Sequence, residues 1–128
     1  MKLRTIQTML VVLVAFVTIT AATPLDDYIA QPDPSYRYEV VSTIDHPQGK
    51  VYILNMTSQT WRSKSEVNRT LWQHWLTIIV PRDVASDTAL LWINGGSNGG
   101  SPPSGPDGML VEIALQSKTV VADLRMVR

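Results

Sequence analysis

A glycine-rich stretch, Gly95-Gly96-Ser97-Asn98-Gly99, is the part of this sequence best suited to chemistry. Its glycines permit sharp turns and positive φ angles at little cost. Backbone N–H groups in such a loop can approach an anion or a polarised carbonyl oxygen, because little side-chain bulk surrounds them. Ser97 also has the surroundings G-x-S-x-G, which are typical of a nucleophilic serine. The stretch therefore predicts either a nucleophile or a set of oxyanion donors.

The G-x-S-x-G pattern acts as the nucleophile elbow of α/β-hydrolases only when a strand precedes the serine and a helix follows it directly. An apolar run at residues 90–93 predicts the strand, but the three prolines within residues 101–106 prevent an immediate helix. We therefore favour the other glycine-rich loop of such enzymes, which gives a backbone N–H group to the oxyanion hole. Its candidate residues are Gly95, Gly96, Ser97 and Asn98, and a purely structural turn is the alternative.

The segments around this loop predict a strand–helix–strand unit. Residues 90–93 are four consecutive apolar residues, which indicate a strand buried on both faces, as in a parallel sheet. A helix-like segment follows at residues 107–118, and a second apolar run follows at residues 119–122. Such units place ligands at the loop after the first strand, which is where the glycines lie.

The upstream residues predict antiparallel strands. Residues 36–43 and 51–56 alternate in polarity around a turn-forming segment at 45–49, which favours a hairpin. Residues 71–80 are largely apolar on both faces, which predicts a central strand. A short helix is expected to begin after Thr23, because a threonine cap is followed by a proline and an acidic first turn. The expected class is α/β, with antiparallel strands leading into the strand–helix–strand unit.

Metal, cofactor and nucleic-acid sites find no support in the sequence. There is no cysteine, and His46 and His74 lack the spacing of a zinc site. The glycine motifs of dinucleotide and P-loop sites are missing as well. The net charge is zero and no basic cluster is present, which argues against a nucleic-acid partner. We therefore expect no cofactor and no metal.

The remaining polar and aromatic candidates have simpler interpretations. His46 is expected in a turn, and His74 is expected to pack on a strand face. Asp123 and Arg125 follow the last apolar run, where α/β folds place functional residues, although an ion pair at the strand end fits equally well. The tryptophans are expected to be core aromatics; they are Trp61, Trp72, Trp75 and Trp92.

The N-terminus has the three parts of a secretory signal peptide. Lys2 and Arg4 are basic, residues 9–19 are apolar, and residues 20–22 are small. An uncleaved anchor is disfavoured, because 11 apolar residues are fewer than the roughly 20 that span a bilayer. We expect residues 1–22 to be removed after Ala22 and residues 23–128 to be secreted, with membrane contact only during export.

Two sequons predict N-glycosylation in a eukaryotic secretory pathway. They are Asn55-Met56-Thr57 and Asn68-Arg69-Thr70. Asn68 is favoured because it lies in a polar loop, whereas Asn55 is expected at the end of a strand whose face is buried.

Several stretches, in the same order, resemble the PhoPQ-activated pathogenicity-related proteins, a family that includes the autocrine proliferation repressor type. The resemblance covers residues 23–128. It rests on Thr23-Pro24-Leu25-Asp26-Asp27-Tyr28, Pro32-Asp33-Pro34, residues 56–62, residues 72–81, Asn94-Gly95-Gly96-Ser97-Asn98-Gly99-Gly100 and Ala122-Asp123-Leu124-Arg125-Met126-Val127.

The resemblance implies an α/β-hydrolase-like fold and an extracytoplasmic protein. Family members are much longer, and their nucleophile-like serine, in an elbow resembling G-x-S-x-R-G, would lie beyond residue 128 with the acid and the histidine. Only the oxyanion-type loop carries over, onto Gly95, Gly96, Ser97 and Asn98. Asn94 departs from the glycine that is common at its position.

Two functions follow as expectations. In the first, this chain is the N-terminal, truncated portion of a secreted serine hydrolase of esterase or peptidase type, and it is inactive alone. In the second, it belongs to a secreted, non-catalytic signalling or binding protein on a hydrolase-like scaffold, because a fold does not imply a function. The sequence specifies neither the substrate nor the receptor.

Overall fold

The computed structural model describes residues 23–127. The predicted signal peptide, with Lys2, Arg4 and the cleavage point after Ala22, lies outside the described residues. Among the described residues, no helix is both long enough and apolar enough to cross a membrane. The chain divides into one unit that ends at Pro32 and a second that begins at Asp33.

The first unit contains helix α2 (Pro24–Ala30), which begins as the sequence predicts. The backbone N–H of Thr23 donates to the Asp26 carboxylate at 2.7 Å, and the Asp26 N–H donates back to the Thr23 hydroxyl at 3.3 Å. This reciprocal pair satisfies two N–H groups that the first turn leaves unpaired. Pro24 occupies the first helical position, where its missing N–H costs nothing.

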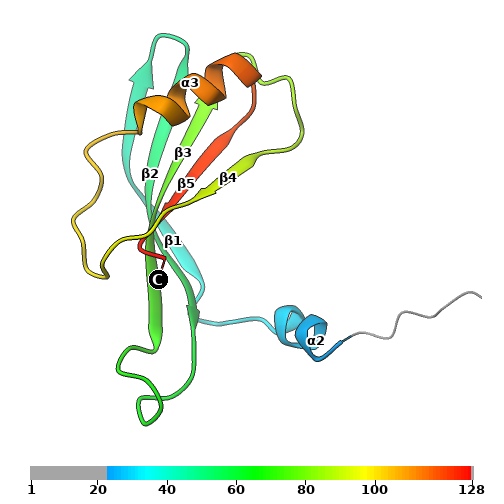
Figure 1. Cartoon of the computed structure of the whole chain (residues 1–128), viewed down its shortest axis with the longest axis vertical. Coiled ribbons are helices and arrows are strands. Elements are labelled where there is room, and N and C mark those ends of the chain that lie inside the picture. The colour runs from blue at the N-terminus through cyan, green and yellow to red at the C-terminus, as the bar shows by residue number, and fades with distance from the viewer. Residues whose placement is uncertain (1–22, 128) are drawn as a thin grey trace, which may run out of the picture. The chain divides into compact units, whose positions relative to one another are not determined.

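The second unit is a mixed, five-stranded sheet in the order β1-β2-β3-β5-β4 (Figure 1). The three long strands form an antiparallel meander; they are β1 (Arg37–His46), β2 (Gly49–Thr60) and β3 (Leu71–Pro81). The other two strands are short: β4 (Leu90–Ile93) and β5 (Val121–Arg125). Strand β5 pairs antiparallel with β3 and parallel with β4. The predicted hairpin, central strand and strand–helix–strand unit are all present, so the chain has an α/β fold.

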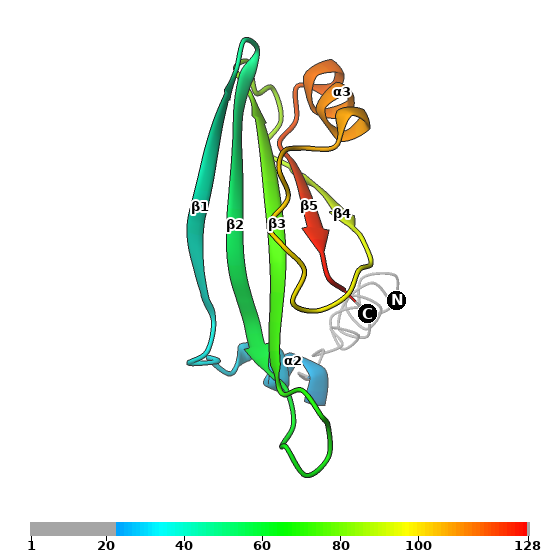
Figure 2. The same ribbon diagram turned by 90° about the vertical axis from the view of Figure 1, so that its left-hand side faces the viewer.

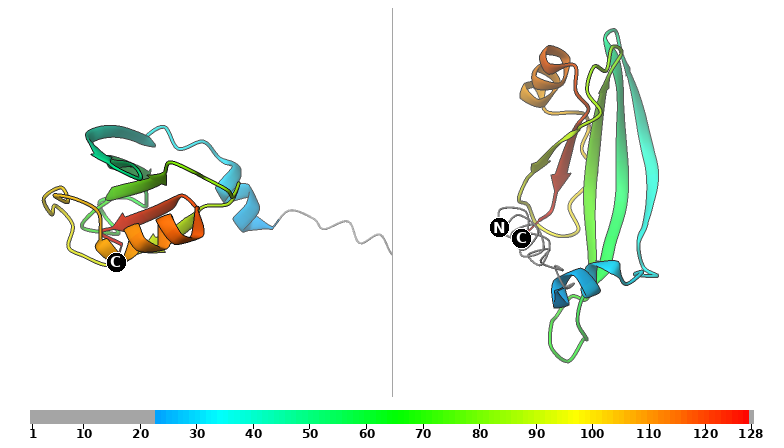
Figure 3. Two further views of the ribbon diagram at one scale, coloured as in Figure 1. Left: turned by 90° about the horizontal axis from the view of Figure 1, so that it is seen from above. Right: turned by 90° about the vertical axis from the view of Figure 1, so that its right-hand side faces the viewer.

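Helix α3 (Gly108–Ser117) connects β4 to β5 and covers one face of the sheet. Its N-cap is Asp107, whose carboxylate accepts hydrogen bonds from the N–H groups of Met109 and Leu110. Figure 2 shows α3 on one side of the strands, and the two views in Figure 3 agree. Leu110 and Ala114 pack against one buried residue from each of three strands: Val51, Ile79 and Val121.

The expectation that residues 90–93 are buried on both faces is wrong. Strand β4 lies at the edge of the sheet, and its four side chains are 38–61% exposed. Among the described elements, α3 contacts β3 and β5 but not β4. The apolar run therefore identifies the strand correctly but does not reveal how many neighbours cover it.

The core on α3 supplies the first prediction. Leu110 is 1% exposed, so Leu110→Ala leaves a cavity between α3 and the sheet and should lower the free energy of unfolding by about 2–5 kcal/mol. Met109, its neighbour on the same helix, is 53% exposed, and Met109→Ala should change that free energy by less than about 0.5 kcal/mol. Urea denaturation measures both values, and equal losses would show that α3 is not packed as described.

Candidate functional site

The glycine loop begins where β4 ends and crosses the sheet on its way to α3 (Figure 1). Backbone bonds hold its first residues to the end of β5. The Asn94 N–H donates to the Leu124 carbonyl at 2.7 Å, and the Gly95 carbonyl accepts from the Met126 N–H at 3.2 Å. Farther along, the indole N–H of Trp75 on β3 donates to the Gly100 carbonyl at 2.8 Å. The loop is therefore fixed at both ends of its glycine-rich segment.

A buried carboxylate anchors the base of the loop. Asp123 on β5 is 1% exposed, and its two oxygens have different partners. One accepts from the side-chain amide of Asn94 at 2.7 Å, and the other accepts from Nε of Arg125 at 2.7 Å. The sequence analysis left two interpretations open for Asp123 and Arg125, and the structure shows the ion pair. Asn94 joins this pair through its hydrogen bond to Asp123.

We call Asn94, Asp123 and Arg125 the carboxylate clamp. The sequence analysis placed Asp123 and Arg125 at a strand end but missed the role of Asn94, which it noted only for departing from a common glycine. The position of Asn94 in the sequence could have revealed this role. Asn94 directly follows one strand of a parallel pair, and Asp123 lies near the end of the other strand.

The conformation of the loop depends on glycine at two positions. Gly96 has a φ of +132° and Gly99 a φ of +76°, which side chains with a Cβ rarely adopt. Within residues 23–127, the N–H groups of Gly95, Gly96, Ser97 and Asn98 make no hydrogen bond. Residues 95–97 are exposed and Asn98 is half-buried. These four groups are therefore available to an oxygen or an anion from outside this segment.

Ser97 lacks the surroundings of a nucleophile among residues 23–127. No helix follows it directly, since α3 begins only at Gly108. No described side chain hydrogen-bonds to its hydroxyl, so no general base is in place. The loop geometry thus supplies N–H donors without an activated serine.

His74 is a packing residue, as the sequence predicts. It is 4% exposed, and both of its ring nitrogens are engaged. Nδ1 lies 3.3 Å from the Arg125 carbonyl and so carries the proton, while Nε2 lies 3.0 Å from the Ser58 hydroxyl. His46 ends β1 at the predicted turn, where its Nδ1 accepts from the Gln48 N–H. Among the residues described, no group of three or more histidine, aspartate or glutamate side chains could hold a metal ion.

The tryptophans are less buried than the sequence analysis expects. Trp61 is 36% exposed and Trp92 is 40% exposed, so these two are not core aromatics. Trp72 and Trp75 are half-buried. Trp61 and Trp72 meet edge to face with ring centroids 5.8 Å apart, beside a hollow of about 190 Å³ that Asn98 of the glycine loop also lines. The sequence gives no sign that these residues gather there.

The two sequons lie in different surroundings. Asn68 is exposed in the connection between β2 and β3. Asn55 is half-buried and lies inside β2, not at a strand end as expected, because β2 continues to Thr60. It is paired with Glu39 on β1 and with Trp75 on β3.

The chain is similar in sequence to a known protein family and to a curated relative. The sequence profile of a family described as PhoPQ-activated pathogenicity-related protein matches residues 25–127. Autocrine proliferation repressor protein A of Dictyostelium discoideum is 33% identical over 114 residues, which are 89% of this chain and 23% of the relative. The chain thus spans about a quarter of the length of that relative. No solved structure matches the chain.

The carboxylate clamp supplies the second prediction. Asn94→Ala leaves an oxygen of the buried Asp123 without its donor, which should cost about 1–3 kcal/mol of stability. It should also speed amide exchange at Met126 and Val127, whose N–H groups bond to the Gly95 and Asn94 carbonyls. Amide hydrogen exchange followed by NMR measures the local effect.

The matched control is Asn98→Ala in the same loop, because the Asn98 side chain makes no hydrogen bond within residues 23–127. This variant should change stability by less than about 0.5 kcal/mol. If Asn94→Ala left exchange at Met126 and Val127 as slow as in the parent chain, the clamp would not be what holds the loop.

Proposed function

This chain belongs to the PhoPQ-activated pathogenicity-related protein family, and we propose that it is the N-terminal portion of an exported serine hydrolase to which it contributes the oxyanion loop. One observation carries the proposal: a glycine loop that follows a parallel strand and keeps the N–H groups of residues 95–98 unpaired within the described residues. Family membership supports it, and so does the signal-like composition of residues 1–22.

In the proposed reaction, a histidine from the remainder of the protein takes the proton of a serine hydroxyl, and the serine oxygen attacks the carbonyl carbon of an ester or amide. The histidine then returns the proton to the alcohol or amine that leaves. The carbonyl oxygen becomes negatively charged in the tetrahedral intermediate, and the N–H groups of Gly95 to Asn98 donate to it. Loss of one such donor costs about 3–4 kcal/mol of transition-state stabilisation in enzymes where it has been tested. The donors are effective only when their positions are fixed beforehand, which is what the clamp and the Trp75 bond provide.

The exposure of β4 is consistent with a larger sheet in the whole protein. Leu91 and Ile93 are 53% and 61% exposed, and β4 has a neighbour on one side only among the described strands. An apolar edge of this kind is a pairing surface. A further strand that paired parallel with β4 would bring its carboxyl end close to the glycine loop, where α/β folds place their reacting groups.

A second function is favoured by the name of the Dictyostelium relative, an autocrine proliferation repressor. In this alternative the protein is exported and acts on a receptor, and the loop is a structural turn without a catalytic part. The two functions differ in whether a reactive serine is required.

The decisive experiment uses the complete product of the gene that encodes this sequence. The hydrolase proposal predicts labelling by a fluorophosphonate probe and hydrolysis of p-nitrophenyl esters. Gly96→Ala should lower kcat by about 10²- to 10³-fold, because a Cβ at a φ of +132° forces the N–H donors to move. Gly105→Ala, in the same connection but in open space and without a positive φ, should leave kcat unchanged.

Other outcomes separate the alternatives. A complete product that is never labelled, yet slows the proliferation of the cells that secrete it, would support the signalling function and refute the hydrolase. The 128-residue chain alone should not be labelled. If it were, and if Ser97→Ala abolished the label, Ser97 would be the nucleophile and the oxyanion assignment would be wrong.

Export and modification can be tested in one expression experiment. In a eukaryotic secretory host, mass spectrometry of the secreted protein should find Thr23 at its N-terminus. Removal of N-glycans by a glycosidase should shift its mobility, and Asn68→Gln should abolish the shift, because Asn68 is exposed in a loop. Asn55→Gln should leave the shift intact, because Asn55 is half-buried and paired with strands on both sides.

A further inference from the structure

The hollow beside the glycine loop has the features of a small-molecule site. It has a volume of about 190 Å³, which corresponds to roughly six water molecules at ~30 Å³ each. That size admits one ring with a short substituent. The site is formed by the β2–β3 connection, the start of β3, the glycine loop and the residue after β5.

Part of the lining of the hollow is apolar and aromatic. Trp61 and Trp72 meet at an interplanar angle of 74°, and Val67 and Met126 line the space beside them. An aromatic ring gains from contact with tryptophan rings and with the Met126 sulfur.

The lining also contains Arg69, a cation without a counter-ion among residues 23–127. Arg69 is exposed, and its guanidinium makes no hydrogen bond or ion pair in the part of the chain that the structure describes. No aspartate or glutamate lines the hollow. The side-chain amides of Asn68, Gln73 and Asn98 also line it, and none of them is hydrogen-bonded elsewhere within residues 23–127.

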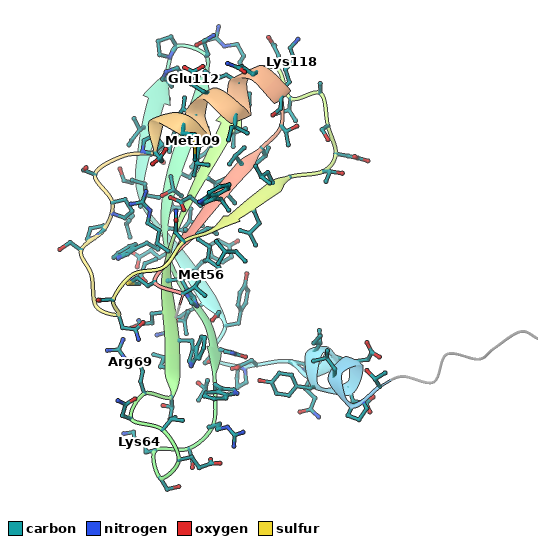
Figure 4. All side chains as sticks on the ribbon, viewed as in Figure 1. Met56, Lys64, Arg69, Met109, Glu112 and Lys118 are labelled. Atoms are coloured by element: carbon teal, nitrogen blue, oxygen red, sulfur yellow. The ribbon has the colours of Figure 1, made fainter. Side chains whose placement is uncertain are left out.

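The β2–β3 connection, which carries Arg69, is held together by hydrogen bonds among its own residues. The Ser63 hydroxyl and N–H, together with Arg62, bond to the Glu66 carboxylate and lower its pKa. Arg62 in turn lies over the Trp61 ring, 5.0 Å from its centroid. Glu66 is thereby paired within its own segment, whereas Arg69, which Figure 4 labels together with Lys64, has no such partner among residues 23–127.

From this combination we propose that the hollow binds a small aromatic carboxylate, with the ring against Trp61 and Trp72 and the carboxylate on Arg69. The planar guanidinium can donate two parallel hydrogen bonds to a carboxylate, and the side-chain amides of Gln73 and Asn98 can donate more. This inference does not rest on the hydrolase proposal, because it concerns binding alone and its test involves no reaction.

The test is isothermal titration of the purified chain with 3-phenylpropanoate and with 3-phenylpropanamide, which has the same ring without the charge. Production in bacteria keeps Asn68 free of a glycan, which matters because Asn68 lines the hollow. The acid should bind roughly tenfold more tightly than the amide, or more, because its contact with Arg69 is charge-assisted. Butanoate and glucuronate should both bind much more weakly, because they lack the aromatic ring.

Three variants locate the binding. Arg69→Gln should reduce the affinity for the acid to that for the amide and leave the amide unaffected. Trp72→Leu should weaken both. Lys64→Gln removes an exposed cation of the same connection that does not line the hollow, so it should change neither affinity (Figure 4).

The proposal is refuted by any of three results. Equal affinities for the acid and the amide would show that Arg69 does not bind the carboxylate. A loss in Lys64→Gln as large as that in Arg69→Gln would mean that general charge attraction explains the binding. Glucuronate binding as tightly as 3-phenylpropanoate would mean that the tryptophans do not select an aromatic ring. Since Arg69 is exposed, Arg69→Gln should fold normally, so the test does not depend on the more buried Trp72.

Discussion

The arrangement of the candidate site depends on the burial of one carboxylate. A buried charge is costly unless it is paired and hydrogen-bonded. Asp123 meets that requirement with Arg125 on its own strand and with Asn94 at the start of the glycine loop. The need to satisfy Asp123 therefore determines where the loop begins, and the backbone bonds from Met126 and Val127 hold the first two loop residues beside the end of β5.

Local patterns in the sequence were sufficient to predict the order and type of most elements. Alternation predicted the hairpin, two apolar faces predicted the central strand, and a helix-like segment at residues 107–118 predicted α3, because these signals arise from the residues themselves. The exposure of β4 could not be predicted in this way. An apolar run reports that a strand is favourable, but burial depends on which elements lie beside and above it, and those are set by the whole sheet.

The site was predictable only in part, for a related reason. The glycine loop can be recognised from the sequence because its residues are contiguous. The clamp joins residues 94 and 123, and the tryptophan hollow joins the β2–β3 connection to residues 98 and 126. Such sets are brought together by the connection through α3 and by the register of the strands. No member of a set shows its role from its residue type alone. A tryptophan in sequence looks the same whether it fills a core or lines a ligand site.

The clamp and the exposed strand are connected by a physical argument. A loop is usually kept in place by the burial of the strand that precedes it, but β4 is 38–61% exposed and α3 does not cover it. Hydrophobic burial within the described residues therefore contributes little at β4. The polar bonds of Asn94 and the indole bond of Trp75 instead fix the loop to β5 and β3, which are better covered. The orientation of the four unpaired N–H groups consequently follows from polar geometry on the inner strands, and it would persist whatever packs against the outer face of β4.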